Sequence, residues 1–217
     1  MGRSEHQRLE MVKRQIVGRG VKDPRVLAAM REVPREAFVP EEIRERAYED
    51  GPLPIGDGQT ISQPYVVAWM VEALDLGEGD RVLEIGAGSG YAAAVLASLA
   101  HQVYTVERLP ALADSARQRL AALGYDNVEV RCDDGTLGWE EHAPYDAILV
   151  SAGAPEVPAN LLDQLAEGGR LVIPVGEDRR VQRLLRYVRK DGSDFEHGEL
   201  GRVQFVPLIG SGGWDPE

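Results

Sequence analysis

The second half of the chain alternates short apolar runs with longer amphipathic stretches. The amphipathic stretches, at 90–99, 110–123 and 158–167, have helical spacing. Nearly continuous apolar strands separated by helices are typical of a parallel sheet that is covered on both faces. The pattern therefore predicts an α/β fold with a Rossmann-like, doubly wound, mostly parallel sheet. Its strands are expected at residues 81–86, 102–107, 128–133, 145–151 and 170–176.

The two ends of the chain have different patterns. His6–Arg19 carries apolar residues at helical spacing, and Asp23-Pro24 predicts the start of a second helix that runs to Arg31 and ends at Val33-Pro34. Two strand-like runs, 181–188 and 202–208, flank the turn signal Asp191-Gly192 and are expected to pair antiparallel. An N-terminal helical extension and C-terminal antiparallel strands are thus added to the core.

Residues 51–64 (GPLPIGDGQTISQP) are rich in Gly and Pro and indicate a long loop without regular structure. Long loops in compact proteins are often functional. An apolar helix is expected from Tyr65 to Leu74. We interpret residues 1–217 as a single catalytic domain, made of a helical N-terminal region with an active-site loop (1–76), a cofactor-binding core (77–176) and C-terminal strands with a tail (177–217).

Composition narrows the function classes. The 36 acidic residues outnumber the 24 basic ones, and a net charge of −12 repels phosphate backbones, so nucleic-acid binding is not expected. The sequence has no apolar stretch long enough for a membrane span, and its polar N-terminus does not resemble a signal peptide, so we expect a cytoplasmic protein without membrane contact. Cys132 is the only cysteine, and the four histidines have no metal-ligand spacing, so no metal site is predicted.

The first predicted strand of the core runs into a glycine-rich segment, Glu84-Ile85-Gly86-Ala87-Gly88-Ser89-Gly90. Alternating glycines let the backbone approach a ligand closely before a helix begins, although a plain tight turn is also compatible. The dinucleotide fingerprint fits only as Gly88, Gly90 and Ala93, which places its glycines late. The spacing favours the pattern that binds S-adenosylmethionine.

Acidic residues stand at the end of the next predicted strand and just after the one that follows it. Glu107 could accept both hydroxyls of a ribose, and Asp134-Gly135 could meet an adenine amino group, although taken singly they also fit an exposed carboxylate and an ordinary turn. Together with the glycines they resemble the class I S-adenosylmethionine-dependent methyltransferases. The resemblance implies Glu107 on the ribose, Asp134 and Gly135 near adenine, and, around the methionine moiety, Glu84, Gly86, Ala87, Gly88 and Gly90.

The methyl acceptor is indicated by further motifs. The chain lacks the Asn/Asp-Pro-Pro-aromatic element of base amino-methylases, and Cys132 does not follow a proline as in cytosine-carbon methylases. Across residues 6–210 the chain resembles the protein-L-isoaspartate O-methyltransferase family. The matching segments are QTISQP (59–64), VLEIGAGSGY (82–91), Val106-Glu107-Arg108, Asp134-Gly135, YDAILVSAGAPEVP (145–158), LAEGGRLVIPVG (165–176) and RVQFVPLIG (202–210).

This resemblance implies methyl transfer from S-adenosylmethionine to the free carboxylate of isoaspartyl (or D-aspartyl) residues in damaged peptides and proteins, by an enzyme that we expect to be monomeric. Ser62 falls on the family's active-site serine, and Thr60 is expected near the cofactor or the substrate. From spacing alone Ser62 also fits a helix N-cap, and the two roles are compatible.

The reaction suits this sequence. The α-carboxyl that isoaspartate exposes has a pKa of about 3.3–3.7, so it is an anion at neutral pH and needs no general base. Other readings are a methyltransferase for another carboxylate or a small molecule, a non-catalytic adaptor, and a nicotinamide-dependent oxidoreductase.

Overall fold

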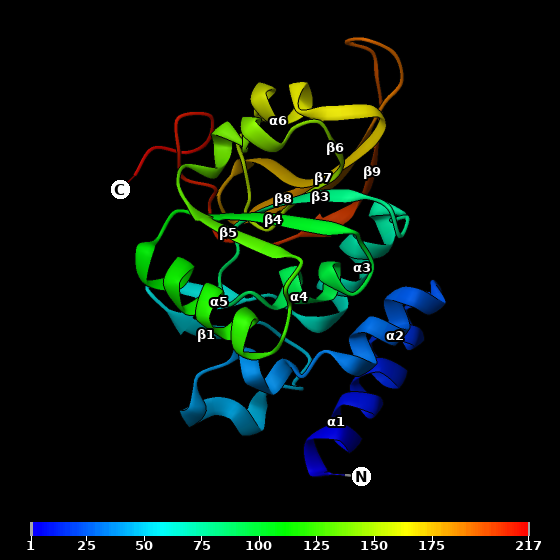
Figure 1. Cartoon of the computed structure of the whole chain (residues 1–217), viewed down its shortest axis with the longest axis vertical. Helices are drawn as coiled ribbons and strands as arrows, with labels where there is room; N and C mark the ends of the chain where they lie inside the picture. Colours follow the sequence, from blue (N-terminus) through cyan, green and yellow to red (C-terminus); the bar gives the residue numbers. More distant parts are fainter. Residues whose placement is uncertain (1, 217) are drawn as a thin grey trace.

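The computed structural model describes residues 2–216, so residues 1 and 217 of the predicted domain lie outside it. Its centre is a seven-stranded sheet with the order β5-β4-β3-β6-β7-β8-β9 (Figure 1). Within residues 2–216, no helix has both the length and the apolarity needed to cross a membrane. The strands of this sheet are β3 (Arg81–Ile85), β4 (Gln102–Glu107), β5 (Val128–Cys132), β6 (Tyr145–Val150), β7 (Leu165–Asp178), β8 (Val181–Arg189) and β9 (Phe195–Val203).

The strand pairing confirms the predicted fold class. Strands β3 to β7 run parallel to one another, whereas β8 pairs antiparallel with β7 and β9 pairs antiparallel with β8. Strand β3 pairs with β4 on one side and with β6 on the other, so the strand order reverses there. Open α/β sheets bind ligands at the carboxyl ends of the strands beside such a reversal.

Helices cover both faces of the sheet. Along β6, Ala147 and Leu149 belong to one core cluster and Ile148 and Val150 to the other, as the two-residue period of a strand requires. The first cluster also contains residues of α3 and α4, and the second contains Leu161 of α6. The covering helices are α3 (Pro64–Leu74), α4 (Tyr91–Ala97), α5 (Pro110–Ala122) and α6 (Ala159–Asp163), with short 3-10 turns η5 (Gly135–Leu137) and η6 (Glu140–His142).

The N-terminal region is helical, as predicted, and packs below the core in Figure 1. The carboxylate of Asp23 accepts a hydrogen bond from the Arg25 amide at the start of α2, and the chain turns extended at Val33 before Pro34. Buried residues of this region share one cluster with the sheet. Its elements are α1 (Arg3–Met11), the π-helical turn η1 (Val12–Ile16), η2 (Val17–Arg19), α2 (Pro24–Glu32), η3 (Arg35–Phe38) and η4 (Glu41–Arg46).

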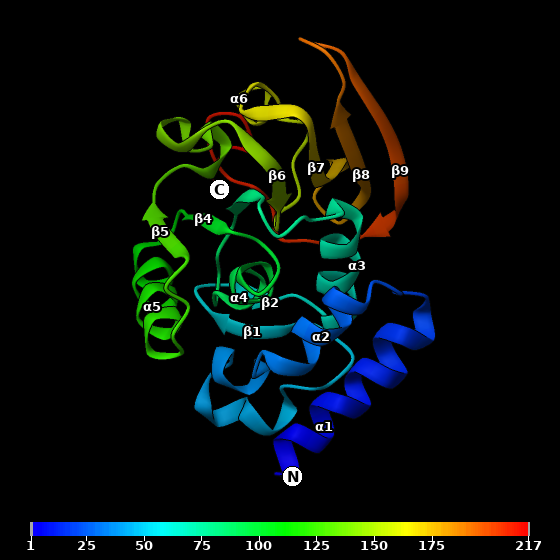
Figure 2. The same cartoon turned by 45° about the vertical axis from the view of Figure 1, so that its right-hand side comes forward.

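Residues 51–64 are not the irregular loop that the sequence suggested. Strands β1 (Leu53–Gly56) and β2 (Gln59–Ile61) form an antiparallel hairpin. Asp57 and Gly58, with φ of 50° and 70°, form its turn, as Asp-Gly does in two-residue hairpins. Figure 2 shows the hairpin between the N-terminal helices and α4.

Two boundaries near the C-terminus were also wrong. Helix α6 ends at Asp163, because the chain from Leu165 already extends β7. The last strand is Phe195–Val203 and not 202–208, since residues 204–208 leave the sheet and Pro207 pairs with Gly153 through an isolated bridge.

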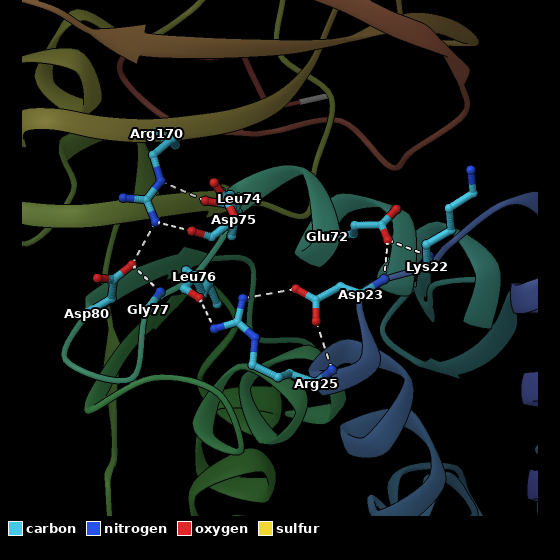
Figure 3. A network of polar contacts seen from close by, with 10 residues as sticks. All are labelled: Lys22, Asp23, Arg25, Glu72, Leu74, Asp75, Leu76, Gly77, Asp80 and Arg170. Atoms are coloured by element: carbon cyan, nitrogen blue, oxygen red, sulfur yellow. Dashed lines mark hydrogen bonds and ion pairs between the residues drawn. The ribbon is translucent and has the colours of Figure 1, made fainter.

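Polar contacts fix the C-terminal end of α3 (Figure 3). The Arg170 guanidinium donates to the carbonyls of Leu74 and Asp75 at 2.7 and 2.6 Å and to the carboxylate of Asp80 at 2.7 Å. The Glu72 carboxylate accepts from the backbone amides of Lys22 and Asp23 at 2.5 and 2.7 Å. These contacts connect α3 both to the sheet and to the N-terminal region.

Candidate active site

A cleft of about 100 Å³ lies at the carboxyl ends of β3, β4 and β6. It is closed on one side by the hairpin and on another by residues 206–209, which follow the last strand. Five of the ten predicted site residues line it. These five are Thr60, Gly86, Gly88, Glu107 and Gly135.

The glycine segment turns sharply beneath the hairpin. Gly86, Gly88 and Gly90 have φ of 91°, 51° and 88°, a region that favours glycine. A Cβ on Gly88 would lie 3.3 Å from Cδ1 of Ile55 in β1. The glycines therefore allow the hairpin to approach the turn between β3 and α4 closely.

Glu107 stands at the end of β4 with 8% of its surface exposed. Its carboxylate accepts a hydrogen bond from the Gly88 amide and another from the Leu109 amide, both at 2.9 Å. A carboxylate has about four acceptor positions, so two stay available for a ligand in the cleft.

Glu84 is fully buried on β3. Thr105 donates a hydrogen bond of 2.6 Å to Oε2, whereas Oε1 has no partner among the described residues. Burial raises the pKa of Glu84 to about 8, with a smaller contribution from the charge of Glu107 and an opposing one from Thr105. The Glu84 carboxyl is therefore largely neutral at pH 7.

Asp134 lies at the start of η5 and anchors the C-terminal segment. Oδ1 accepts from the amide and hydroxyl of Thr136 at 2.9 and 2.7 Å, and Oδ2 accepts from the amide and hydroxyl of Ser211 at 2.8 and 3.0 Å. Burial opposes the charged form, but these hydrogen bonds outweigh it and lower the pKa of Asp134. Because all four acceptor positions are filled, a contact with adenine would have to replace one of them.

Ser62 lies between the cleft and a larger groove. It lines a small cavity together with Glu84 and the glycine segment, including Ala87, and it also lines an adjoining groove of about 760 Å³. Its hydroxyl does not cap α3, whose N-cap is Gln63 and has no side-chain cap. The capping interpretation of Ser62 was therefore wrong.

Sequence reasoning missed some of the site. Ser151 lines the cleft, the small cavity and the groove, as Thr60 does. Its position directly after β6, opposite Gly86 after β3, was the signal that could have identified it. Among residues 2–216, no group of three or more His, Cys, Asp or Glu side chains could hold a metal ion.

Known proteins resemble this chain over nearly its full length. The family model described as protein-L-isoaspartate(D-aspartate) O-methyltransferase (PCMT) matches residues 6–213. Protein-L-isoaspartate O-methyltransferase 2 of Pelobacter propionicus is 63% identical and covers 97% of this chain and 93% of its own. Protein-L-isoaspartate O-methyltransferase 1 of Rhodopseudomonas palustris is 62% identical, covering 96% and 85%.

Solved structures agree with these sequences. A protein-L-isoaspartate O-methyltransferase superposes with a TM-score of 0.85 at 33% identity, covering 96% of this chain and 67% of that chain. A Plasmodium falciparum structure described as a β-aspartate methyltransferase (PCMT), in complex with S-adenosyl-L-homocysteine, gives a TM-score of 0.80 at 30% identity, covering 96% and 99%. The chain belongs to the protein-L-isoaspartate(D-aspartate) O-methyltransferase family.

Proposed function

We propose that this protein transfers a methyl group from S-adenosylmethionine to the free carboxylate of isoaspartyl residues in peptides and proteins. Family membership supports the reaction class. The observation that carries the proposal for this chain is the small cavity lined by both Ser62 and the glycine segment, because it joins the cleft to the groove. A donor in the cleft and a peptide in the groove would meet there.

The cleft fits the proposed cofactor. S-adenosylmethionine supplies an electrophilic methyl group on a positively charged sulfur. Glu107 offers free acceptor positions for the ribose hydroxyls, and the buried Glu84, whose Oε1 has no partner among the described residues, lines the same small cavity as the glycine segment. The cleft is lined by Thr60, Gly86, Gly88 and Gly135 and the small cavity by Ala87, so these residues would lie against the ligand. Gly90, with its positive φ, would shape the turn before α4. Asp134 would act through the segment that it anchors.

The residues around the acceptor carboxylate would orient it and exclude water from it. The carboxylate arrives as an anion, so no proton has to be removed. The Ser62 hydroxyl would donate a hydrogen bond to one carboxylate oxygen and fix its direction. The positive charge of the sulfonium and the negative charge of the carboxylate cancel during the transfer. A site that holds the carboxylate oxygen, the methyl group and the sulfur in line and excludes water favours this step. The hairpin would provide the wall.

The decisive experiment compares two peptides that differ only in an isoaspartyl or an aspartyl residue. We expect a base-labile methyl ester on the isoaspartyl peptide alone. Equal esterification of both peptides would contradict the proposed specificity, and no methylation of either would contradict the activity.

Two variants assign the roles. Ser62→Ala should lose most turnover and still bind S-adenosylmethionine, because the serine contacts only the acceptor. Glu107→Ala should instead weaken cofactor binding. Normal methylation by the first variant, or unchanged cofactor affinity of the second, would remove that residue from the mechanism.

We also propose that the chain acts as a monomeric, single catalytic domain in the cytoplasm, without binding nucleic acid. The core cluster shared by the N-terminal region and the sheet supports the single domain, and the net charge of −12 argues against nucleic-acid binding. Light scattering coupled to gel filtration tests the monomer, and a binding titration with duplex DNA at low salt tests the charge argument.

A further inference from the structure

Arg35 is a buried cation that has no role in the site described above. Its side chain is 0% exposed, although arginine is seldom buried without a partner. Its Nε donates to the carbonyl of Ala47 at 2.7 Å, and its Nη2 donates to the carbonyl of Ser62 at 2.8 Å. The guanidinium carbon lies 4.8 Å from the ring centroid of Tyr91.

The charge of Arg35 is not balanced locally. Within residues 2–216 its Nη1 has no hydrogen-bond partner, and its two bonded acceptors are neutral carbonyls. Burial lowers the pKa of Arg35, and the opposing influences come from Tyr91 and Tyr48. A guanidinium nevertheless stays protonated in proteins. Burying an ion in this way costs free energy, so an apolar side chain of similar length would be expected if stability alone mattered.

The bond to Ser62 gives Arg35 a connection to the chemistry. Ser62 is the single residue between β2, which ends at Ile61, and Gln63, the N-cap of α3. Its neighbours are held by the sheet and the helix, but its own carbonyl is held by Arg35. Tyr91, which the guanidinium covers, lines the same small cavity as Ser62. Arg35 therefore contacts two residues that line the cavity, Ser62 and Tyr91, without lining the cavity itself.

We propose that Arg35 is a positioning residue, which fixes the Ser62 backbone through its carbonyl so that the Ser62 hydroxyl meets the acceptor carboxylate. This inference rests on the proposed function of Ser62. It also links the N-terminal region to the reaction. Arg35 belongs to η3, and Ala47, whose carbonyl is its other acceptor, follows η4. The N-terminal helices then act on the reaction without touching the reactants.

The test compares Arg35→Met with Arg170→Met. Arg170 is a matched control, because it binds two backbone carbonyls at the opposite end of α3, far from Ser62 in the chain. We expect Arg35→Met to lower kcat for an isoaspartyl peptide by about 10- to 100-fold, the usual cost of misplacing a group in a site. Its affinity for S-adenosyl-L-homocysteine should change by less than about threefold, as Arg35 does not line the cleft.

A double-mutant cycle separates positioning from a general loss of structure. If Arg35 acts through Ser62, then Arg35→Met should change kcat little in a Ser62→Ala background, because the two effects are not additive. Arg170→Met should lower the melting temperature and reduce kcat equally in both backgrounds. Arg35→Lys, which keeps the charge but not the planar fork that reaches both carbonyls, should recover part of kcat and serves as the test variant if Arg35→Met does not fold.

Two outcomes would overturn the inference. One is a kcat loss no larger than that of Arg170→Met at a matched melting temperature. The other is full additivity with Ser62→Ala. Wild-type protein that does not methylate the isoaspartyl peptide would instead refute the proposed function, so the two failures are distinguishable.

Discussion

Glu84 is a carboxyl group that the fold keeps away from water. Its Oε2 accepts a hydrogen bond from Thr105, its Oε1 has no partner among the described residues, and Glu84 lines the small cavity beside the glycine segment. Desolvation disfavours its ionised form, which explains the raised pKa of about 8. A neutral acid at this position can adapt to a ligand by ionising, whereas a simple apolar residue could not.

The raised pKa has a consequence for stability. The folded protein holds the Glu84 proton more tightly than the unfolded chain, so the stability from this group is complete below the unfolded pKa near 4.5 and is lost as pH rises through about 8. Glu84→Gln, measured by urea unfolding without cofactor, should gain stability relative to wild type as pH rises from 5 to 8. The gain should be of the order of a few kcal/mol. A constant difference between the two proteins over this range would contradict the buried, neutral acid.

At the level of elements, strands were predicted best where burial on both faces dictates the sequence. Strand β4 has the predicted bounds, and β3 and β6 each end one residue earlier than expected. The β1–β2 hairpin was missed because Pro54 and Gly56 have low strand propensity. Pairing with β2 and packing against the glycine turn stabilise it, and these are tertiary contacts that local pattern does not reveal.

The residues of the site also differ in whether the sequence could predict them. The glycines and Glu107 were identifiable because the glycine segment directly follows β3 and Glu107 is the last residue of β4. Arg35 was not, since its contact with Ser62 joins residues 27 positions apart and leaves no periodic signal. The anchoring contacts of Asp134 also depend on a distant segment, as Ser211 is 77 positions away.

Asp134 allows a test of how an element closes the site. Asp134→Ala leaves the amides of Thr136 and Ser211 without their acceptor, so residues 204–212 should loosen at a cost of about 1–3 kcal/mol. We expect faster hydrogen exchange in this segment and weaker binding of S-adenosyl-L-homocysteine, because residues 206–209 line the cleft.

Ser211→Ala is the matched control. It removes the hydroxyl contact at 3.0 Å and leaves the Asp134 carboxylate in place. If Ser211→Ala speeds hydrogen exchange and weakens ligand binding, both by less than Asp134→Ala does, Asp134 acts through the segment. If Ser211→Ala loosens the segment and leaves ligand affinity unchanged, while Asp134→Ala abolishes binding, Asp134 contacts the ligand directly.

On the scale of the whole molecule, the cleft is where distant parts of the chain meet. The hairpin contributes Gln59 and Thr60, the sheet contributes the strand ends, and the C-terminal segment contributes Val206 to Ile209. The N-terminal helices share one core cluster with the sheet, and Arg170 and Glu72 tie α3 to both (Figure 3). A ligand in the cleft therefore contacts parts whose stability depends on one another.

This arrangement predicts a single, ligand-sensitive unfolding transition. A ligand that binds only the folded protein adds about 2.7 kcal/mol of stability at 100 times its Kd. For a domain of this size that corresponds to a rise in Tm of roughly 5–11 °C. Calorimetry with saturating S-adenosyl-L-homocysteine should show one transition that moves as a whole, with equal calorimetric and van't Hoff enthalpies. Two transitions of which only one responds to the ligand would mean that the N-terminal region unfolds independently, and Arg35 could then not brace the site at temperatures where that region has already melted.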